Sequence, residues 1–182
     1  MNKGFSVIEL VVICAIIATF SVVLILNFKS SPKTKIARNQ IAAVIVSDIR
    51  RMQSSALAGS RYQGGAVCGY GIHYINKTSY LLYAGVLDGG ITSCINTNHN
   101  YQAGTDYLVE TKNITNLNME IRSAFSDVFF ESPDPKTYIN NNSLLSGSPI
   151  TISVQLKNQQ NCAQQSCTQI TVYPSGKIDL AN

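Results

Sequence analysis

The chain has 182 residues, a net charge of +4 and only 13% charged residues. Its length suits one globular domain with an additional element, and so mild a charge does not by itself favour a nucleic-acid partner. The long apolar side chains concentrate in residues 1–28, and the remainder is rich in Asn, Gln, Ser, Thr and Gly. The sequence therefore predicts two physically different regions.

The first region is an apolar run over Phe5–Leu26, FSVIELVVICAIIATFSVVLIL, in which Glu9 is the only charged residue. Leu10–Leu26 would span roughly 25 Å as a helix, and the preceding apolar residues would extend it to the thickness of a bilayer core. It has no polar stripe of the kind that a soluble core helix shows. We therefore expect a transmembrane and assembly helix over residues 5–28.

Other interpretations of this run fit less well. A secretory signal peptide has a shorter apolar stretch and a small-residue cleavage site, and no such site follows this run. A plain membrane anchor leaves Glu9 unexplained, because a carboxylate inside a bilayer is costly and usually functional. A buried hairpin is disfavoured by the length of the run.

Residues 3–10, Lys-Gly-Phe-Ser-Val-Ile-Glu-Leu, resemble the prepilin peptidase site of type IV pilins and type II secretion pseudopilins. The resemblance implies that a leader of residues 1–4 is removed by cleavage between Gly4 and Phe5, and that the new amino group of Phe5 is methylated. The remaining helix could then pack in a bundle of identical helices. Glu9 would need a partner there, and the amine of Phe5 on a neighbouring subunit is suitable, so that the pair would set the stagger between subunits.

The distribution of basic residues opposes the simplest topology. Only Lys3 precedes the apolar run, and counting the basic residues that follow it would place the C-terminal side in the cytoplasm. These residues are Lys29, Lys33, Lys35 and Arg38. The cleavage motif and the cysteines favour export instead. We therefore expect a single-pass protein of the cytoplasmic (inner) membrane, with its globular domain outside the cytoplasm, that later joins an extracytoplasmic filament.

An amphipathic helix is predicted within residues 29–60, from about Thr34 to Ala58. Pro32 marks either a kink or a first turn, and Gly59 is a stop signal. Apolar residues recur at steps of four and three, which places them on one helical face: Ala37, Ile41, Ile45, Ile49, Met52 and Ala56. The arginines on and after this helix are few and lack interleaved aromatic residues, which favours a solvated face over a nucleic-acid patch.

Residues 61–182 are predicted to form a β-rich globular domain. Period-two patterns bounded by turn residues indicate strands at Cys68–Ile75, Tyr80–Ala84, Tyr107–Thr111, Asn118–Ile121, Val128–Glu131, Ile150–Leu156, 170–172 and Lys177–Leu180. The expected fold class is α+β, with one long N-terminal helix, half membrane-embedded and half amphipathic, packed on an antiparallel sheet as in the pilin fold. The stretches 71–74, 80–83 and 174–177 resemble minor pseudopilins of the H type and related minor pilins.

Four cysteines lie in this domain, at Cys68, Cys94, Cys162 and Cys167. An even number in a polar domain behind an apolar segment suggests disulfides, and three pairings are open. We favour the local pairs Cys68–Cys94 and Cys162–Cys167, which would contribute roughly 3.5 and 2 kcal/mol in the chain-entropy model. The alternative is a zinc site, for which the spacing is poor. Cys14 is expected to be a small apolar filler.

The sequence contains no constellation of catalytic, cofactor-binding or metal-binding residues. His73 and His99 have no metal-ligand spacing. We therefore expect no enzyme and no cofactor, but a structural subunit, minor rather than abundant, of a type IV pilus-like or type II secretion pseudopilus filament. The partners implied by the resemblance are other pilin or pseudopilin subunits, the prepilin peptidase and methyltransferase, and an inner-membrane assembly platform. The alternative is a filament-associated minor pilin that binds DNA or a surface ligand through its C-terminal domain.

Overall fold

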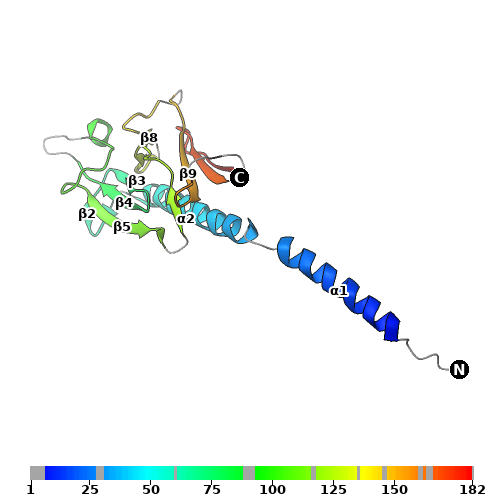
Figure 1. Cartoon of the computed structure of the whole chain (residues 1–182). Helices are drawn as coiled ribbons and strands as arrows, with labels where there is room; N and C mark the ends of the chain where they lie inside the picture. The colour runs from blue at the N-terminus through cyan, green and yellow to red at the C-terminus, as the bar shows by residue number, and fades with distance from the viewer. Residues whose placement is uncertain are drawn as a thin grey trace. The chain divides into compact units, whose positions relative to one another are not determined.

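The structure is a computed structural model of the whole chain (Figure 1). It describes residues 7–27, 31–59, 61–87, 93–115, 118–134, 136–144, 147–159, 162 and 166–181. The chain divides into two compact units, residues 1–36 and residues 37–182.

The described residues form two α-helices, α1 (Val7–Asn27) and α2 (Ser31–Ala58). The expectation of one long helix is therefore wrong. The physical reason lies at Pro32, which is the second residue of α2, where a missing N–H and a fixed φ suit the start of a helix. α2 ends at Ala58 because Gly59 follows with a φ of 142°, a value that strongly favours glycine.

The membrane prediction also needs correction. Within the part of the chain that the structure describes, neither helix is long and apolar enough to cross a bilayer. Side chains of α1 are described over residues 7–22, a stretch that rises about 24 Å, whereas a bilayer core is about 30 Å thick. The predicted transmembrane half of the helix is therefore wrong, and so is the single-pass placement in the cytoplasmic membrane that depended on it.

The globular unit has three antiparallel sheets among its described residues rather than the single sheet that we expected. They are a hairpin β1-β2, a five-stranded sheet in the order β5-β4-β3-β7-β8, and a four-stranded sheet in the order β11-β10-β9-β6. The strands are β1 (Arg61–Tyr62), β2 (Gly65–Ala66), β3 (Gly69–Asn76), β4 (Ser79–Gly85), β5 (Tyr107–Asn113), β6 (Met119–Ile121), β7 (Val128–Glu131), β8 (Thr137–Ile139), β9 (Ile150–Leu156), β10 (Cys167–Val172) and β11 (Ile178–Ala181).

The main core forms where α2 meets both large sheets. The predicted apolar face of α2 is buried, with Ile45 and Ile49 both at 0% exposure. It shares one cluster with Tyr80 and Leu82 of β4 and with residues of β9 and β10 such as Ile152. An amphipathic helix buries its apolar stripe against whichever sheet faces are free. Here both sheets supply such a face.

A second, smaller core lies on the other face of the five-stranded sheet. Successive side chains of a strand point to opposite faces. Leu81 and Tyr83 therefore point away from the main core and pack with Phe129 and Tyr138. The loop that carries Cys94 covers this cluster. Both faces of β4 are therefore buried, which explains why its described residues are all buried.

Candidate functional site

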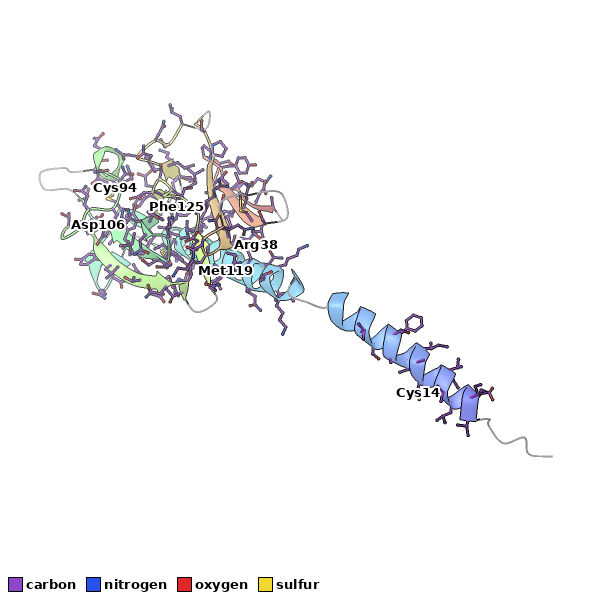
Figure 2. The ribbon with its side chains drawn as sticks, in the orientation of Figure 1. Cys14, Arg38, Cys94, Asp106, Met119 and Phe125 are labelled. Atoms are coloured by element: carbon purple, nitrogen blue, oxygen red, sulfur yellow. A yellow bond between two sulfur atoms is a disulfide. The ribbon has the colours of Figure 1, made fainter. Side chains whose placement is uncertain are left out.

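The sequence places the candidate assembly site on α1, and its described side chains stand in solvent. Val7 is 81% exposed, Ile8 74% and Phe20 67%. Figure 2 shows the side chains of α1 projecting from the ribbon, with Cys14 labelled. Cys14 is a free thiol and is exposed. A row of large apolar side chains of this length is a binding surface for other apolar groups.

The polar side chains of α1 do not interrupt this surface. The hydroxyl of Thr19 donates a hydrogen bond to the carbonyl oxygen of Ile16 at 2.8 Å, and that of Ser21 donates to Ile17 at 2.7 Å. Each hydroxyl is therefore satisfied by the backbone of its own helix. The helix can enter an apolar environment without burying an unpaired hydroxyl at either position.

Glu9 is the only acidic residue in the first turn of α1. The first four N–H groups of a helix have no partner within it, and the helix dipole favours a negative charge there. A carboxylate in this position is therefore compatible with the helix and remains available to a partner. The cleavage and methylation residues predicted from the sequence, Gly4 and Phe5, lie outside the described residues.

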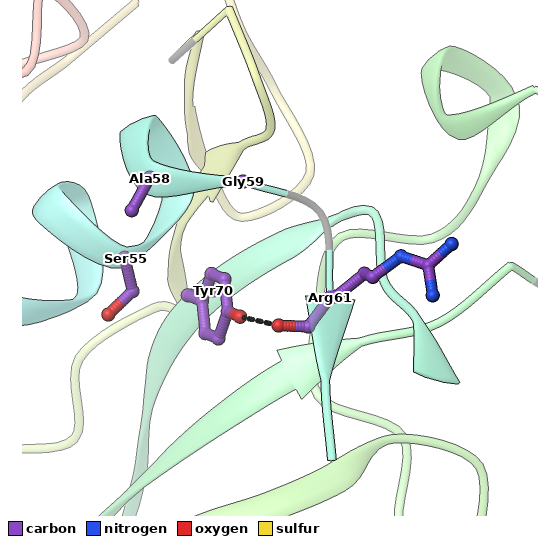
Figure 3. A pocket seen from close by; sticks show the side chains of 5 residues that line it. All are labelled: Ser55, Ala58, Gly59, Arg61 and Tyr70. Carbon is purple, nitrogen blue, oxygen red and sulfur yellow. Dashed lines mark hydrogen bonds between the residues drawn. The ribbon is translucent and has the colours of Figure 1, made fainter. Parts of the chain in front are cut away.

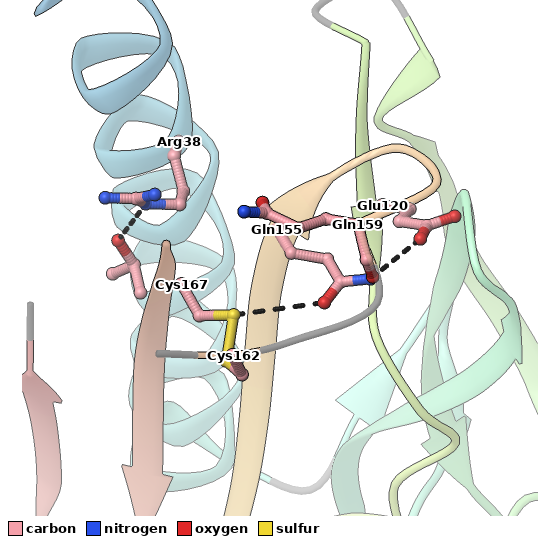
Figure 4. Close-up of a disulfide and its surroundings, with 7 residues drawn as sticks. Arg38, Glu120, Gln155, Gln159, Cys162 and Cys167 are labelled. Atoms are coloured by element: carbon pink, nitrogen blue, oxygen red, sulfur yellow. Dashed lines mark hydrogen bonds between the residues drawn. A yellow bond between two sulfur atoms is a disulfide. The ribbon is translucent and has the colours of Figure 1, made fainter. Parts of the chain in front are cut away.

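Both favoured disulfides are present in the globular unit. Cys68 bonds to Cys94, and Cys162 bonds to Cys167. The four sulfur atoms that a zinc site would need are therefore used in bonds with one another. The first disulfide ties the 3₁₀ helix η1 (Cys94–Asn96) to the start of β3, and the second lies beside β10 (Figure 4).

The two histidines hold the loop that follows η1. Nδ1 of His73 lies 2.7 Å from Oδ1 of Asp127, whose other oxygen accepts the N–H of Tyr101 at 2.7 Å. Nδ1 of His99 lies 2.8 Å from Oδ1 of Asn141, and its ring stacks on Tyr138 with centroids 3.6 Å apart. Their partners lie far away in the sequence, so the sequence carries no local signal for these contacts. Both sets of contacts fix the loop on the sheet.

Two arginines of α2, Arg38 and Arg51, contact residues of the sheets. Arg38 is buried, and its Nε donates to the hydroxyl of Thr168 at 3.0 Å. Arg51 pairs with Glu110 of β5 at 2.6 Å. Hydrogen bonding by Lys112, and then by Arg51, lowers the pKa of Glu110. The prediction of a solvated helix face is therefore wrong for Arg38, which is buried against β10, whereas Arg51 is exposed as expected.

A hollow of about 420 Å³ lies at the end of α2. Its lining is Ser55, Ala58, Gly59, Arg61 and Tyr70 (Figure 3). The hydroxyl of Tyr70 donates to the carbonyl oxygen of Arg61 at 2.8 Å, while the guanidinium of Arg61 points away from Tyr70. The only charged side chain of the lining is therefore turned away from Tyr70, and the hollow offers little to recognise a ligand.

No protein-family model, no curated protein and no solved structure matches the chain.

Proposed function

We propose that this chain is a structural subunit of a filament of the type IV pilus or type II secretion pseudopilus kind, and that it assembles through α1. The observation that supports the proposal best is the exposed apolar surface of α1, whose only charge is Glu9 at its first turn. A bundle of such helices would cover this surface, and Glu9 would meet a positive partner from a neighbouring subunit. The disulfide-bonded globular unit would then form the outer part of the filament.

The N-terminal motif predicts cleavage and methylation of the chain, and both can be measured. The full chain is expressed with a prepilin peptidase, and the mature protein is measured by intact and peptide mass spectrometry. The expected product starts at Phe5 and carries an added methyl group on its amine. A Gly4→Leu variant removes the small residue before the cut and is expected to stay uncut, because a side chain there blocks close approach of the peptidase to the backbone. A mature N-terminus at any other residue contradicts the proposal.

A variant that removes the charge of Glu9 on α1 tests the proposed assembly. The Glu9→Gln variant keeps the size of the side chain and removes its charge, which would leave a buried amine unpaired in the bundle. We expect its amount in sheared filaments to fall at least tenfold relative to the unchanged chain. Asp134→Asn removes an exposed charge of the globular unit and is the matched control, with no expected effect. Equal incorporation of the two variants contradicts a role for Glu9.

The contact of Lys177, the residue before β11, does not favour the alternative of DNA binding. Lys177 pairs with Asp179 at 2.7 Å, and this partner raises the pKa of Lys177. The lysine is therefore charged but has a carboxylate beside it, which weakens its attraction for a phosphate.

A further inference from the structure

A second hollow of about 420 Å³ lies beside β6 in the globular unit. Its lining residues are far from α1 in the sequence. It is lined by Lys77, Glu120, Arg122, Gln155, Asn158 and Gln159. Each of these side chains is polar or charged. They come from the turn between β3 and β4, from β6 and the residue after it, and from β9 and the turn that follows it. The site therefore depends on three segments that only the fold brings together.

Glu120 is the central acidic group of this hollow. It is only 6% exposed, and its Oε1 accepts a hydrogen bond from Nε2 of Gln155 at 2.8 Å. The amide of Gln155 also donates to the carbonyl oxygen of Gln159 at 2.9 Å, so both of its protons are used. Within the described residues no cation lies within ion-pair distance of Glu120. A buried carboxylate with a single side-chain donor is stabilised by further O–H or N–H donors.

Two cations flank this acid. Lys77 and Arg122 line the same hollow, both are exposed, and neither has an ion-pair partner among the described residues. With Glu120 they give the hollow a charge of +1. The guanidinium of Arg122 can bind a carboxylate in a bidentate manner. The hollow therefore offers an acceptor for hydroxyl groups at its buried side and donors for an acidic group at its exposed side.

Backbone hydrogen bonds hold the segments that carry the lining residues. The N–H of Ile121 donates to the carbonyl oxygen of Lys77 at 2.6 Å, and that of Arg122 donates to Ser153 at 2.9 Å. On its other side, the amide oxygen of Gln155 lies 3.9 Å from Sγ of Cys167, and Figure 4 shows Gln155 between that disulfide and Glu120. The side chains of Glu120 and Gln155 are therefore fixed before any ligand binds, which lowers the entropy cost of binding at this side of the hollow.

We propose that this hollow binds a saccharide that carries an acidic group. Hydroxyl groups of the sugar donate to Glu120 and accept from the amides of Asn158 and Gln159, and the acidic group pairs with Lys77 and Arg122. A neutral sugar would leave both cations unused. A simple anion would meet the carboxylate of Glu120, and a divalent cation would meet the two positive side chains. This binding activity is independent of filament assembly.

The binding test uses the full, disulfide-bonded chain in calorimetric or saturation-transfer NMR titrations. The probes are a trimer of galacturonic acid, the matching trimer of galactose, inorganic phosphate and calcium chloride. We expect the acidic trimer to bind and the neutral one to bind at least tenfold more weakly. Equal binding of the two trimers, binding of phosphate as tight as that of the acidic trimer, saturable binding of calcium at this hollow, or no binding of any probe overturns the proposal.

Variants locate the site and separate it from a plain anion site. Glu120→Gln is expected to weaken binding of the acidic trimer at least tenfold, because the acceptor for the sugar hydroxyls loses its charge. At an anion site the same change would strengthen binding, because it removes a repulsion. Lys77→Gln and Asn158→Gly alter exposed side chains, and glycine tolerates the φ of 67° at position 158. Each change is expected to weaken binding. Lys157→Gln, next to the hollow but not lining it, is the matched control. Unchanged affinity in the Lys77 and Asn158 variants, or a gain in Glu120→Gln, overturns the assignment.

Discussion

At the scale of single residues, Asp48 and Tyr80 show how α2 is fixed on the five-stranded sheet. Asp48 is 7% exposed, and Tyr80 is fully buried. The tyrosine hydroxyl donates to Oδ2 of Asp48 at 2.7 Å, while Arg51 and Lys112 each lie 3.9 Å from its other oxygen. A buried carboxylate is tolerated only when donors and cations surround it. The network therefore fixes one position of α2 on β4 and β5.

Loss of the tyrosine hydroxyl should destabilise the globular unit. Tyr80→Phe leaves Asp48 buried without its strongest donor, and we expect a loss of about 1–3 kcal/mol in the free energy of unfolding. Urea unfolding followed by circular dichroism measures it. Tyr74→Phe is the control, with an expected change within about 0.5 kcal/mol, because the hydroxyl of Tyr74 has no hydrogen-bond partner among the described residues. Equal losses in the two variants would show that the bond to Asp48 contributes nothing.

Alkaline pH should destabilise the protein through the same residue. Burial, and then the hydrogen bond to Asp48, raise the pKa of Tyr80, and burial raises that of Tyr83. An unfolded tyrosine ionises near pH 10, while the folded state keeps both phenols protonated. The unfolded state therefore binds fewer protons above that pH, and the free energy of unfolding should fall by about 1.4 kcal/mol per pH unit for each tyrosine.

Urea unfolding between pH 9 and 11 checks this slope. The measurement uses a Cys14→Ser background, so that no free thiolate starts disulfide exchange. Tyr80→Phe should remove the contribution of one tyrosine and make the fall shallower. A slope that is the same in both proteins would exclude Tyr80 as a source of the alkaline instability.

At the scale of elements, the loop from η1 to β5 is held by a disulfide and by side chains. Cys68 joins it to β3, His99 joins it to Asn141, and Tyr101 joins it to Asp127. Together these contacts seat the loop over the smaller core. A polar loop with little regular structure can stay ordered there because its three anchors lie next to the ends of β3, β7 and β8.

The two disulfides should differ in their contribution to stability. The Cys68–Cys94 bond closes a loop with a sequence separation of 26, and the Cys162–Cys167 bond closes one with a separation of 5. The chain-entropy model then predicts losses of about 3.5 and 2 kcal/mol for the paired changes Cys68→Ala/Cys94→Ala and Cys162→Ala/Cys167→Ala. Urea unfolding of both double variants measures which disulfide contributes more to the free energy of unfolding. A larger loss from the shorter loop would contradict the entropic account.

At the scale of the whole molecule, the chain contains two kinds of apolar surface. The large apolar side chains of α2 at positions such as Ile45 are buried within the globular unit, whereas those of α1, such as Phe20, are exposed. The first kind stabilises the fold of residues 37–182. The second kind is stabilised when another apolar surface covers it.

Removal of residues 1–30 should separate folding from association. The truncated chain keeps all of α2 and is expected to be a monomer with cooperative thermal unfolding, because no described side chain of α1 belongs to the core. The full chain is expected to associate in buffer without detergent. Light scattering coupled to size-exclusion chromatography, together with circular dichroism, measures both properties. Association that persists after truncation would place the binding surface on the globular unit instead.

The sequence alone determined the features that arise from local periodicity. It predicted the buried face of α2, the end of that helix at Gly59, and most strands, including β3, β4, β7 and β9, because periods of 3.6 and 2 follow directly from backbone geometry. It also favoured the two disulfides that the structure contains. It did not predict β1, β2 or β8, which are only two or three residues long and too short to show a period.

Only the tertiary structure decided what depends on residues far apart in the chain. The expectation of one sheet failed because β7 pairs with β3 and β6 pairs with β9, and local patterns carry no information on such pairing. The expectation of one long helix failed at Pro32, whose two interpretations the sequence left open. The hollow at Glu120 could not be predicted for the same reason. Gln155 of β9 and Lys77 of the turn between β3 and β4 lie beside β6 only through contacts between residues far apart in the sequence.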